Sequence, residues 1–173
     1  MRHPLASFVT LALLWAVVSE LNHLLTGWHV YLWVGGLFVT FSAVTLPLRA
    51  GLLTSFLGGL LLDSLAPVTF GTQAVLLATA HALIFNVRDR VPREETAARV
   101  VIALFANLAL FLVFSFLQIR HVPTPATVWP RLIVDLLCSQ VFIAVVAPWF
   151  FALQARAIGL SDLAAAAYDR RFR

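Results

Sequence analysis

The sequence of 173 residues contains no lysine and one cysteine, and only 12% of its residues are charged. A soluble domain carries about 25% charged and about 45–50% apolar residues, whereas this chain is 61% hydrophobic. Cys138 has no second cysteine with which to form an internal disulfide. The composition therefore excludes soluble enzymes, nucleic-acid-binding proteins and secreted disulfide scaffolds. A mean hydropathy of +0.93 is typical of an integral membrane protein.

Six apolar runs of about 20 residues are each long enough to cross roughly 30 Å of hydrocarbon as a helix. They cover residues 5–25, 28–46, 48–66, 70–87, 100–119 and 132–153. We predict an all-α integral membrane fold, a single six-helix transmembrane bundle with no separate soluble domain. Residues 154–173 are predicted to form a cytoplasmic tail, in which Ser161 caps a short helix.

The distribution of arginine predicts the orientation of the chain. All twelve basic residues are arginines, and eight acidic residues leave a formal charge of +4. With the N-terminus inside, the outer segments hold only Arg120 and Arg131. The other ten are Arg2, Arg49, Arg88, Arg90, Arg93, Arg99, Arg156, Arg170, Arg171 and Arg173. Because cytoplasmic loops are enriched in arginine, both termini are expected in the cytoplasm, where the tail anchors the topology at the membrane surface or contacts a partner.

The third run contains the shortest uncharged stretch of the six. Only 13 uncharged residues separate Arg49 from Asp63, about 20 Å of helix at 1.5 Å per residue. Either Asp63 is immersed near the outer end of this helix, or the third and fourth runs form a re-entrant hairpin. Both alternatives return the chain to the cytoplasmic side, so the orientation of the remaining spans is the same.

Two aspartates within the apolar runs are candidate functional residues, because a charge in hydrocarbon costs about 2.5–3.5 kcal/mol on insertion scales. Asp135 lies four residues after Arg131, and a local ion pair at this spacing is one explanation. Asp63 has no basic neighbour in the sequence. Both aspartates are expected near the outer ends of their helices, where they could share a hydrated cavity.

Asp63 also ends a pattern of small residues. Gly51, Ser55 and Gly59 precede it at intervals of four, which places all four residues on one face of a helix. Small side chains allow two membrane helices to approach closely. This face, which we call the small-residue stripe, is therefore either an internal helix contact or a docking surface for a partner helix. We take the stripe and Asp135 as candidate partner-binding residues.

Other polar residues within the runs have simpler explanations. Glu20, Asn22 and His23 cluster at the end of the first run and are interpreted as interfacial. His81 and Asn107 lie mid-span and are expected to form hydrogen bonds between helices. No Gly-x-Ser-x-Gly, His-Glu-x-x-His or phosphate-binding glycine-rich motif occurs. We predict no catalytic activity, no metal and no cofactor.

One part of the chain resembles a known family. The run Gly58-Gly-Leu-Leu-Leu-Asp63-Ser, then Phe70-Gly71-Thr-Gln-Ala74 and a span ending at Arg88–Arg90, resembles the rod shape-determining protein MreD. The resemblance implies a non-catalytic scaffold of the bacterial cell-elongation complex, in the inner membrane. The partners it implies are an MreC-like membrane protein, the MreB filament, and the RodA glycosyltransferase with its transpeptidase.

The resemblance also leaves a second function open. The MreD family is thought to be similar in fold to the six-helix substrate-binding subunits of energy-coupling-factor transporters. A chain of this kind could therefore be the substrate-binding membrane subunit of a vitamin-type uptake system. Recovery of either wall-synthesis proteins or transporter ATPases with the purified protein would distinguish the two functions.

Overall fold

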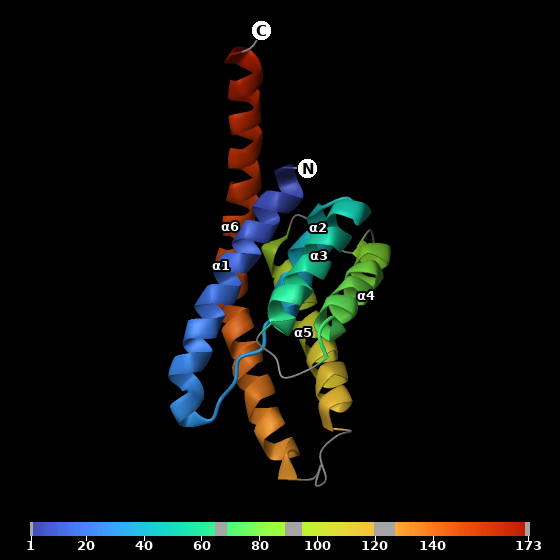
Figure 1. The fold of residues 1–173 in the computed structure, drawn as a ribbon, viewed down its shortest axis with the longest axis vertical. Helices are drawn as coiled ribbons and strands as arrows, with labels where there is room; N and C mark the ends of the chain where they lie inside the picture. The colour runs from blue at the N-terminus through green and yellow to red at the C-terminus, as the bar shows by residue number, and fades with distance from the viewer. Residues whose placement is uncertain (1, 65–68, 89–94, 120–126, 172–173) are drawn as a thin grey trace.

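The computed structural model describes the backbone of residues 2–64, 69–88, 95–119 and 127–171, and side chains between 4 and 159 within those ranges. The described residues form α-helices, one short 3-10 helix and non-helical connections, with no strand. The elements are α1 (Arg2–Leu25), η1 (Thr26–Trp28), α2 (Gly35–Thr45), α3 (Leu48–Asp63), α4 (Thr72–Val87), α5 (Thr96–Ile119) and α6 (Trp129–Arg171). Both ends of the chain lie at the same end of the molecule (Figure 1).

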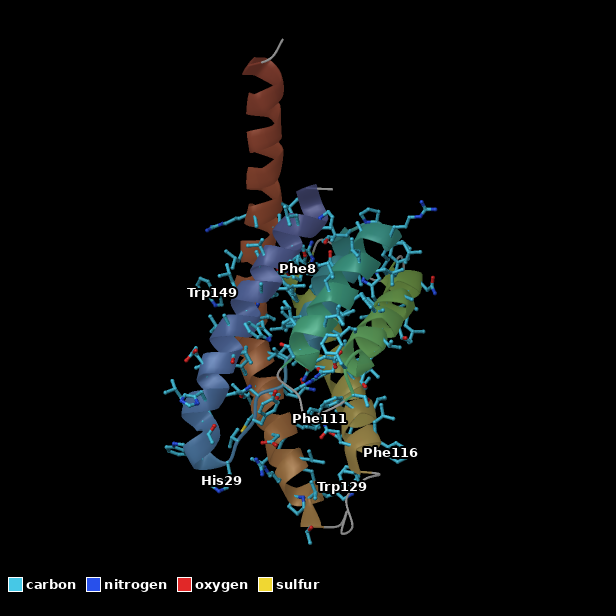
Figure 2. All side chains as sticks on the ribbon, viewed as in Figure 1. Phe8, His29, Phe111, Phe116, Trp129 and Trp149 are labelled. Carbon is cyan, nitrogen blue, oxygen red and sulfur yellow. The ribbon has the colours of Figure 1, made fainter. Side chains whose placement is uncertain are left out.

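Three of these helices, α1, α5 and α6, are long and apolar enough to cross a membrane. Their outward faces carry large apolar side chains, of which Leu13 is 56% exposed, Phe105 67% and Trp149 79%. Figure 2 shows Trp149 pointing away from the bundle. Contiguous apolar surface of this extent is rare on soluble monomers, and it suits helices that face lipid.

The centre of the bundle is the short helix α2. All ten residues from Gly35 to Val44 are buried, because α2 packs against α3, α4 and α5 on different sides. A helix that is apolar all round is expected in such a position. Gly36 allows α2 to approach α5 closely, since a Cβ there would meet the backbone oxygen of Ala103 on α5 at 2.3 Å.

The prediction of one helix over residues 28–46 is wrong. The chain instead forms η1, then a non-helical segment from His29 to Val34, and only then α2. His29 follows the 3-10 turn in the left-handed region at φ 57°, which stops the helix. The aromatic and β-branched residues that follow favour an extended backbone, and side chains from other helices satisfy its polar groups, as described below.

The remaining expected spans correspond to helices with shifted ends. The first and fifth become α1 and α5, and the sixth is the beginning of the much longer α6. Residue 161 lies inside α6, so the short capped helix expected in the tail is instead its continuation. Pro148 lies within this helix without ending it.

The third and fourth runs form a short antiparallel pair. Helices α3 and α4 have 16 residues each, or about 24 Å at 1.5 Å per residue. Their adjoining ends lie well short of the level that α1, α5 and α6 reach at the lower end of Figure 1. They pack together closely because Gly59 faces the backbone of Ala74, whose Cα would be 2.4 Å from an added Cβ.

This contact predicts different effects at two neighbouring glycines. Gly59→Ala should lower the free energy of unfolding by roughly 1–3 kcal/mol, because its Cβ would overlap backbone atoms that cannot move separately. Gly58→Ala is the matched control: its Cβ would meet only the side chains of Phe38 at 3.0 Å and Leu11 at 3.4 Å. We expect a change within about 1 kcal/mol for the control. Unfolding of both variants in mild detergent measures this, and equal destabilisation would contradict it.

Candidate functional site

The non-helical segment His29–Val34 is the least ordinary feature of the bundle. Leu32, Trp33 and Val34 are at most 7% exposed, so their backbone groups have little access to water. A buried amide or carbonyl without a partner costs about 1–3 kcal/mol. Non-helical backbone at membrane depth is therefore tolerated only where it is buried in protein or lines a polar cavity.

Asn22, near the end of α1, supplies the first pair of bonds. Its Oδ1 accepts from the Leu32 N–H at 2.7 Å, and its Nδ2 donates to the Leu32 carbonyl at 3.0 Å. The amide side chain thus substitutes for a neighbouring strand. The sequence predicts an interfacial role for Asn22. In the structure, Asn22 instead binds both the backbone N–H and the backbone carbonyl of Leu32.

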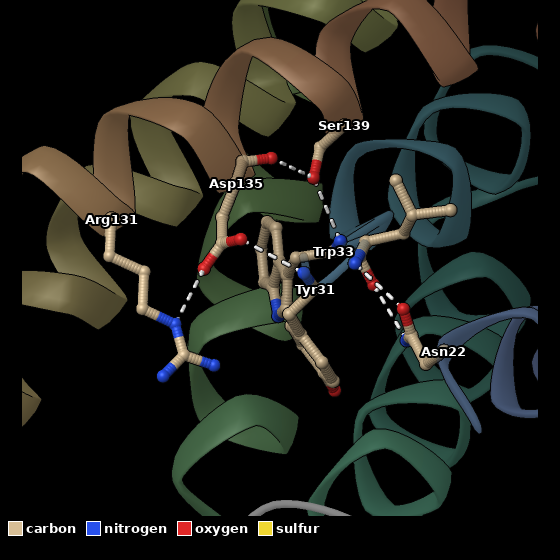
Figure 3. A network of polar contacts seen from close by, with 7 residues as sticks. Asn22, Tyr31, Trp33, Arg131, Asp135 and Ser139 are labelled. Atoms are coloured by element: carbon tan, nitrogen blue, oxygen red, sulfur yellow. Dashed lines mark hydrogen bonds and ion pairs between the residues drawn. The ribbon is translucent and has the colours of Figure 1, made fainter. Parts of the chain in front are cut away.

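Helix α6 supplies the next two bonds, which Figure 3 shows together with those of Asn22. The Tyr31 N–H donates to Asp135 Oδ1 at 2.9 Å, and the Trp33 N–H donates to Ser139 Oγ at 2.9 Å. The Ser139 hydroxyl itself donates to the Asp135 carbonyl at 2.6 Å. Alternate residues of the segment are therefore fixed to two successive turns of α6.

Trp33 connects this segment to α4 and α5. Its indole N–H donates to Gln73 Oε1 at 3.3 Å. Its ring lies edge-on to Phe111 and parallel to Phe114, with centroids 6.1 and 6.0 Å away. Such aromatic pairs contribute about 0.5–1.5 kcal/mol beyond the area they bury. The segment thus contacts α1, α4, α5 and α6 within six residues.

Asp135 also forms the ion pair expected from its spacing. Arg131 Nε lies 4.0 Å from Asp135 Oδ2, the arginine side chain being 62% exposed and the aspartate 7%. This confirms the local pair as one role of Asp135. A cleft of about 270 Å³ opens beside Arg131, lined also by Asn22, Thr26, His29, Val30 and Tyr31. We call it the α1/α6 cleft.

Asp63 has a different role at a different place. Its Oδ2 accepts from the N–H groups of Gly71 at 2.9 Å and Ala74 at 3.2 Å, and its Oδ1 from that of Gln73 at 2.9 Å. These are the free N–H groups at the start of α4, where a negative charge is favourable. Gly71, at φ 97°, has no side chain to cap the helix itself, so the last residue of α3 caps it.

The small-residue stripe is filled by the chain's own helices. Gly51 faces the ring of His81, Gly59 faces Ala74, and Ser55 lies 2.9 Å from the Ser42 hydroxyl and 3.1 Å from His81 Nδ1. All four stripe residues, including Asp63, are buried. Of the two alternatives for this face, the internal helix contact is the one present, and a partner could dock there only by displacing α4.

The expectation that Asp63 and Asp135 share a cavity is wrong. Asp63 is 3% exposed and its carboxylate is turned to the start of α4. Asp135 instead contacts the non-helical segment, and the adjacent α1/α6 cleft contains no residue of α3. The separation follows from the shortness of α3, which ends before it reaches this part of α6.

The mid-span polar residues His81 and Asn107 do bond between helices, as predicted. His81 on α4 contacts Ser42 on α2 as well as Ser55 on α3, at 3.4 and 3.1 Å. Asn107 on α5 accepts from the N–H of Gly36 at 3.1 Å, at the start of α2. Both side chains are fully buried. Within the described residues, no group of three potential metal ligands occurs.

No protein-family model, curated protein or solved structure was found to match this chain.

The bonds of Asn22 give a testable prediction. Asn22→Ala should lower the free energy of unfolding by about 2 kcal/mol, because it leaves a buried N–H and a buried carbonyl without partners. Asn86→Ala, at an exposed position near the end of α4, is the matched control and should change it by less than about 0.5 kcal/mol. Detergent unfolding measures both. Indistinguishable variants would mean that Asn22 does not support the segment.

The cap at α4 gives a second prediction for this region. Asp63→Ala should destabilise the protein by on the order of 3 kcal/mol, since three N–H groups lose a charged acceptor. Asp63→Asn retains one side-chain oxygen and should lose about half as much. Thermal unfolding in detergent measures the stability of the wild type and the two variants, which should decrease from wild type to Asp63→Asn to Asp63→Ala. Wild-type stability in the alanine variant would show that the carboxylate does not cap the helix.

Proposed function

We propose that this chain is a non-catalytic scaffold of the bacterial cell-elongation complex, as its resemblance to the MreD family implies. It would act in the inner membrane through helix contacts with an MreC-like membrane protein. The MreB filament and RodA with its transpeptidase would join the same assembly. The observation that best supports a scaffold is the length and position of α6.

Helix α6 has 43 residues, or about 64 Å at 1.5 Å per residue. A membrane crossing needs only about 20 residues, so roughly half of the helix is left over. Figure 1 shows the C-terminal end of this helix, beyond the packed residue Ile158, projecting past the other helices at the end of the molecule where the N-terminus also lies. A helix that continues from the bundle in this way can join the membrane domain to a partner outside the bilayer.

The proposed topology has both termini in the cytoplasm. Helix α1 would cross outward, and the segment from His29 to Thr45 would return. The six non-helical residues can span at most about 20 Å and the 11 residues of α2 about 16 Å, an upper limit that exceeds roughly 30 Å of hydrocarbon. The short α3 and α4 favour a re-entrant hairpin, after which α5 and α6 cross. Arg49 and Arg88 would then lie on the cytoplasmic side with the termini.

Because the small-residue stripe is covered, α6 replaces it as the proposed partner surface. Its outward face carries Val141, Val145 and Trp149, which are 66%, 64% and 79% exposed. This apolar face would contact lipid or a partner helix within the membrane, and the projecting C-terminal end of α6 would contact the cytoplasmic part of the assembly. Asp135 is proposed to support this surface from within, by fixing α6 to the non-helical segment.

The α1/α6 cleft favours the second candidate, a substrate-binding subunit of an uptake system. A polar cleft at the end opposite the termini is where an imported molecule would enter. Its volume of about 270 Å³ is, however, just below the range of about 300–1,000 Å³ usual for small-molecule sites. The cleft therefore suits a group smaller than a vitamin, and the scaffold is the better-supported function.

Purification from the native membrane tests the proposal. The tagged full-length chain in mild detergent should recover a bitopic MreC-like protein or wall synthases, identified by mass spectrometry. A chain ending after Gly159 should keep the bundle, whose packed residues extend to Ile158, and lose most of the recovered partner. Gly27→Ala, which meets no atom within 4 Å, is the control at the opposite end and should recover as much as the wild type.

Two results would contradict the proposal. Recovery of transporter ATPase subunits would favour the uptake system. Undiminished recovery of the same partners by the shortened chain would show that the projecting part of α6 is not the partner surface.

A further inference from the structure

The α1/α6 cleft presents a positively charged group whose donors are partly unused. Arg131 directs its Nε to Asp135, while Figure 3 shows its two terminal nitrogens turned away from that carboxylate. Within the described part of the chain, these two nitrogens have no hydrogen-bond partner. The free edge of a guanidinium matches two oxygens of a phosphate.

A buried carboxylate lies behind the guanidinium. Asp135 Oδ2 faces Arg131, and its Oδ1 accepts the Tyr31 N–H at 2.9 Å. The carboxylate is thus bound to the non-helical segment and cannot turn to cover the rest of the guanidinium. Asp135 is therefore a positioning residue for Arg131.

His29 supplies a second polar side chain to the cleft. It is exposed and adopts φ 57°, and its backbone N–H donates to the Thr26 carbonyl at 3.1 Å. A non-glycine residue in the left-handed region is uncommon, and such positions cluster at functional sites. The turn places an imidazole on the wall of the same cleft as Arg131.

The surroundings of the cleft indicate which phosphate compound would occupy it. Leu24 and Trp28, at the end of α1 and in η1, are 72% and 81% exposed, and Ile133 and Leu137 at the start of α6 are 53% and 60% exposed. A cleft that presents Arg131 and His29 between such apolar helix ends is suited to a molecule with a charged head and apolar chains. The volume of about 270 Å³ suits the head alone, with the chains lying outside along α1 and α6.

We propose that the α1/α6 cleft binds the phosphate of an anionic phospholipid headgroup. Arg131 contacts two phosphate oxygens, His29 donates to a third, and the acyl chains lie on the exposed apolar ends of α1 and α6. The site does not depend on which protein partner the chain has, so it can be tested separately from the proposed function.

Native mass spectrometry of the full-length protein tests the site, with dioleoylphosphatidylglycerol as the probe. Arg131→Gln should weaken binding of one lipid about tenfold, the loss expected for one bidentate charged contact. Arg49→Gln, an exposed arginine at the other end of the bundle, should bind as the wild type does. Asparagine adopts the left-handed backbone readily, so the His29→Asn variant should fold while lacking the imidazole. We expect this second variant to bind the lipid more weakly than the wild type.

Two further probes distinguish the source of the phosphate. Dioleoylphosphatidylcholine at the same concentration should bind more weakly than the anionic lipid. Millimolar inorganic phosphate should not displace the lipid, because it lacks the acyl chains. Equal binding of phosphatidylglycerol by the wild type and by both the Arg131 and His29 variants would overturn the site. Equal binding of the two lipids, or displacement by inorganic phosphate, would overturn the anionic-lipid assignment.

Discussion

The requirement that every buried backbone polar group has a partner controls this structure. Helices α2, α3 and α4 are short, so some of their ends lie inside the bundle where water cannot satisfy them. Side chains from other helices do so instead. Asp63 caps the start of α4 and Asn107 bonds to the start of α2, while Arg88 Nη1 donates to the Leu46 carbonyl at 3.0 Å, just past the end of α2. The same principle explains how Asn22, Asp135 and Ser139 maintain a non-helical segment between α1 and α2.

The sequence predicts the helical class and the three long helices because a long apolar helix is determined by residues that are neighbours in the chain. A run of 20 apolar residues is recognisable by itself, and residues 100–119 and 132–153 both fall within helices that could cross a membrane. The break in the second run was not predictable in this way. Trp28–Leu46 is as apolar as its neighbours, and the partners that stabilise its non-helical part come from residues as far away as Ser139.

The sequence predicts only those parts of the candidate site that have a local signal. Asp63 and Asp135 were identified because charge in an apolar run is costly, and the Arg131 pair was predicted because its partners are one turn apart. Gln73 and Ser139 were missed, since a single neutral polar residue gives little signal in a membrane helix. A weak signal was nevertheless present, because four neutral polar residues each interrupt an apolar run: Asn22, Gln73, Asn107 and Ser139. This pattern indicates buried hydrogen bonds, but it does not indicate which residues bond to each other.

The stability of the non-helical segment depends on these side chains and not on helical bonds. Amide hydrogen exchange of the full-length protein in mild detergent tests this most directly. The amides of Tyr31, Leu32 and Trp33 are predicted to exchange as slowly as those inside α2, because each has a side-chain acceptor in the bundle. Exchange as fast as at the exposed turn Thr26–Trp28 would contradict the account and show that the segment is an open loop.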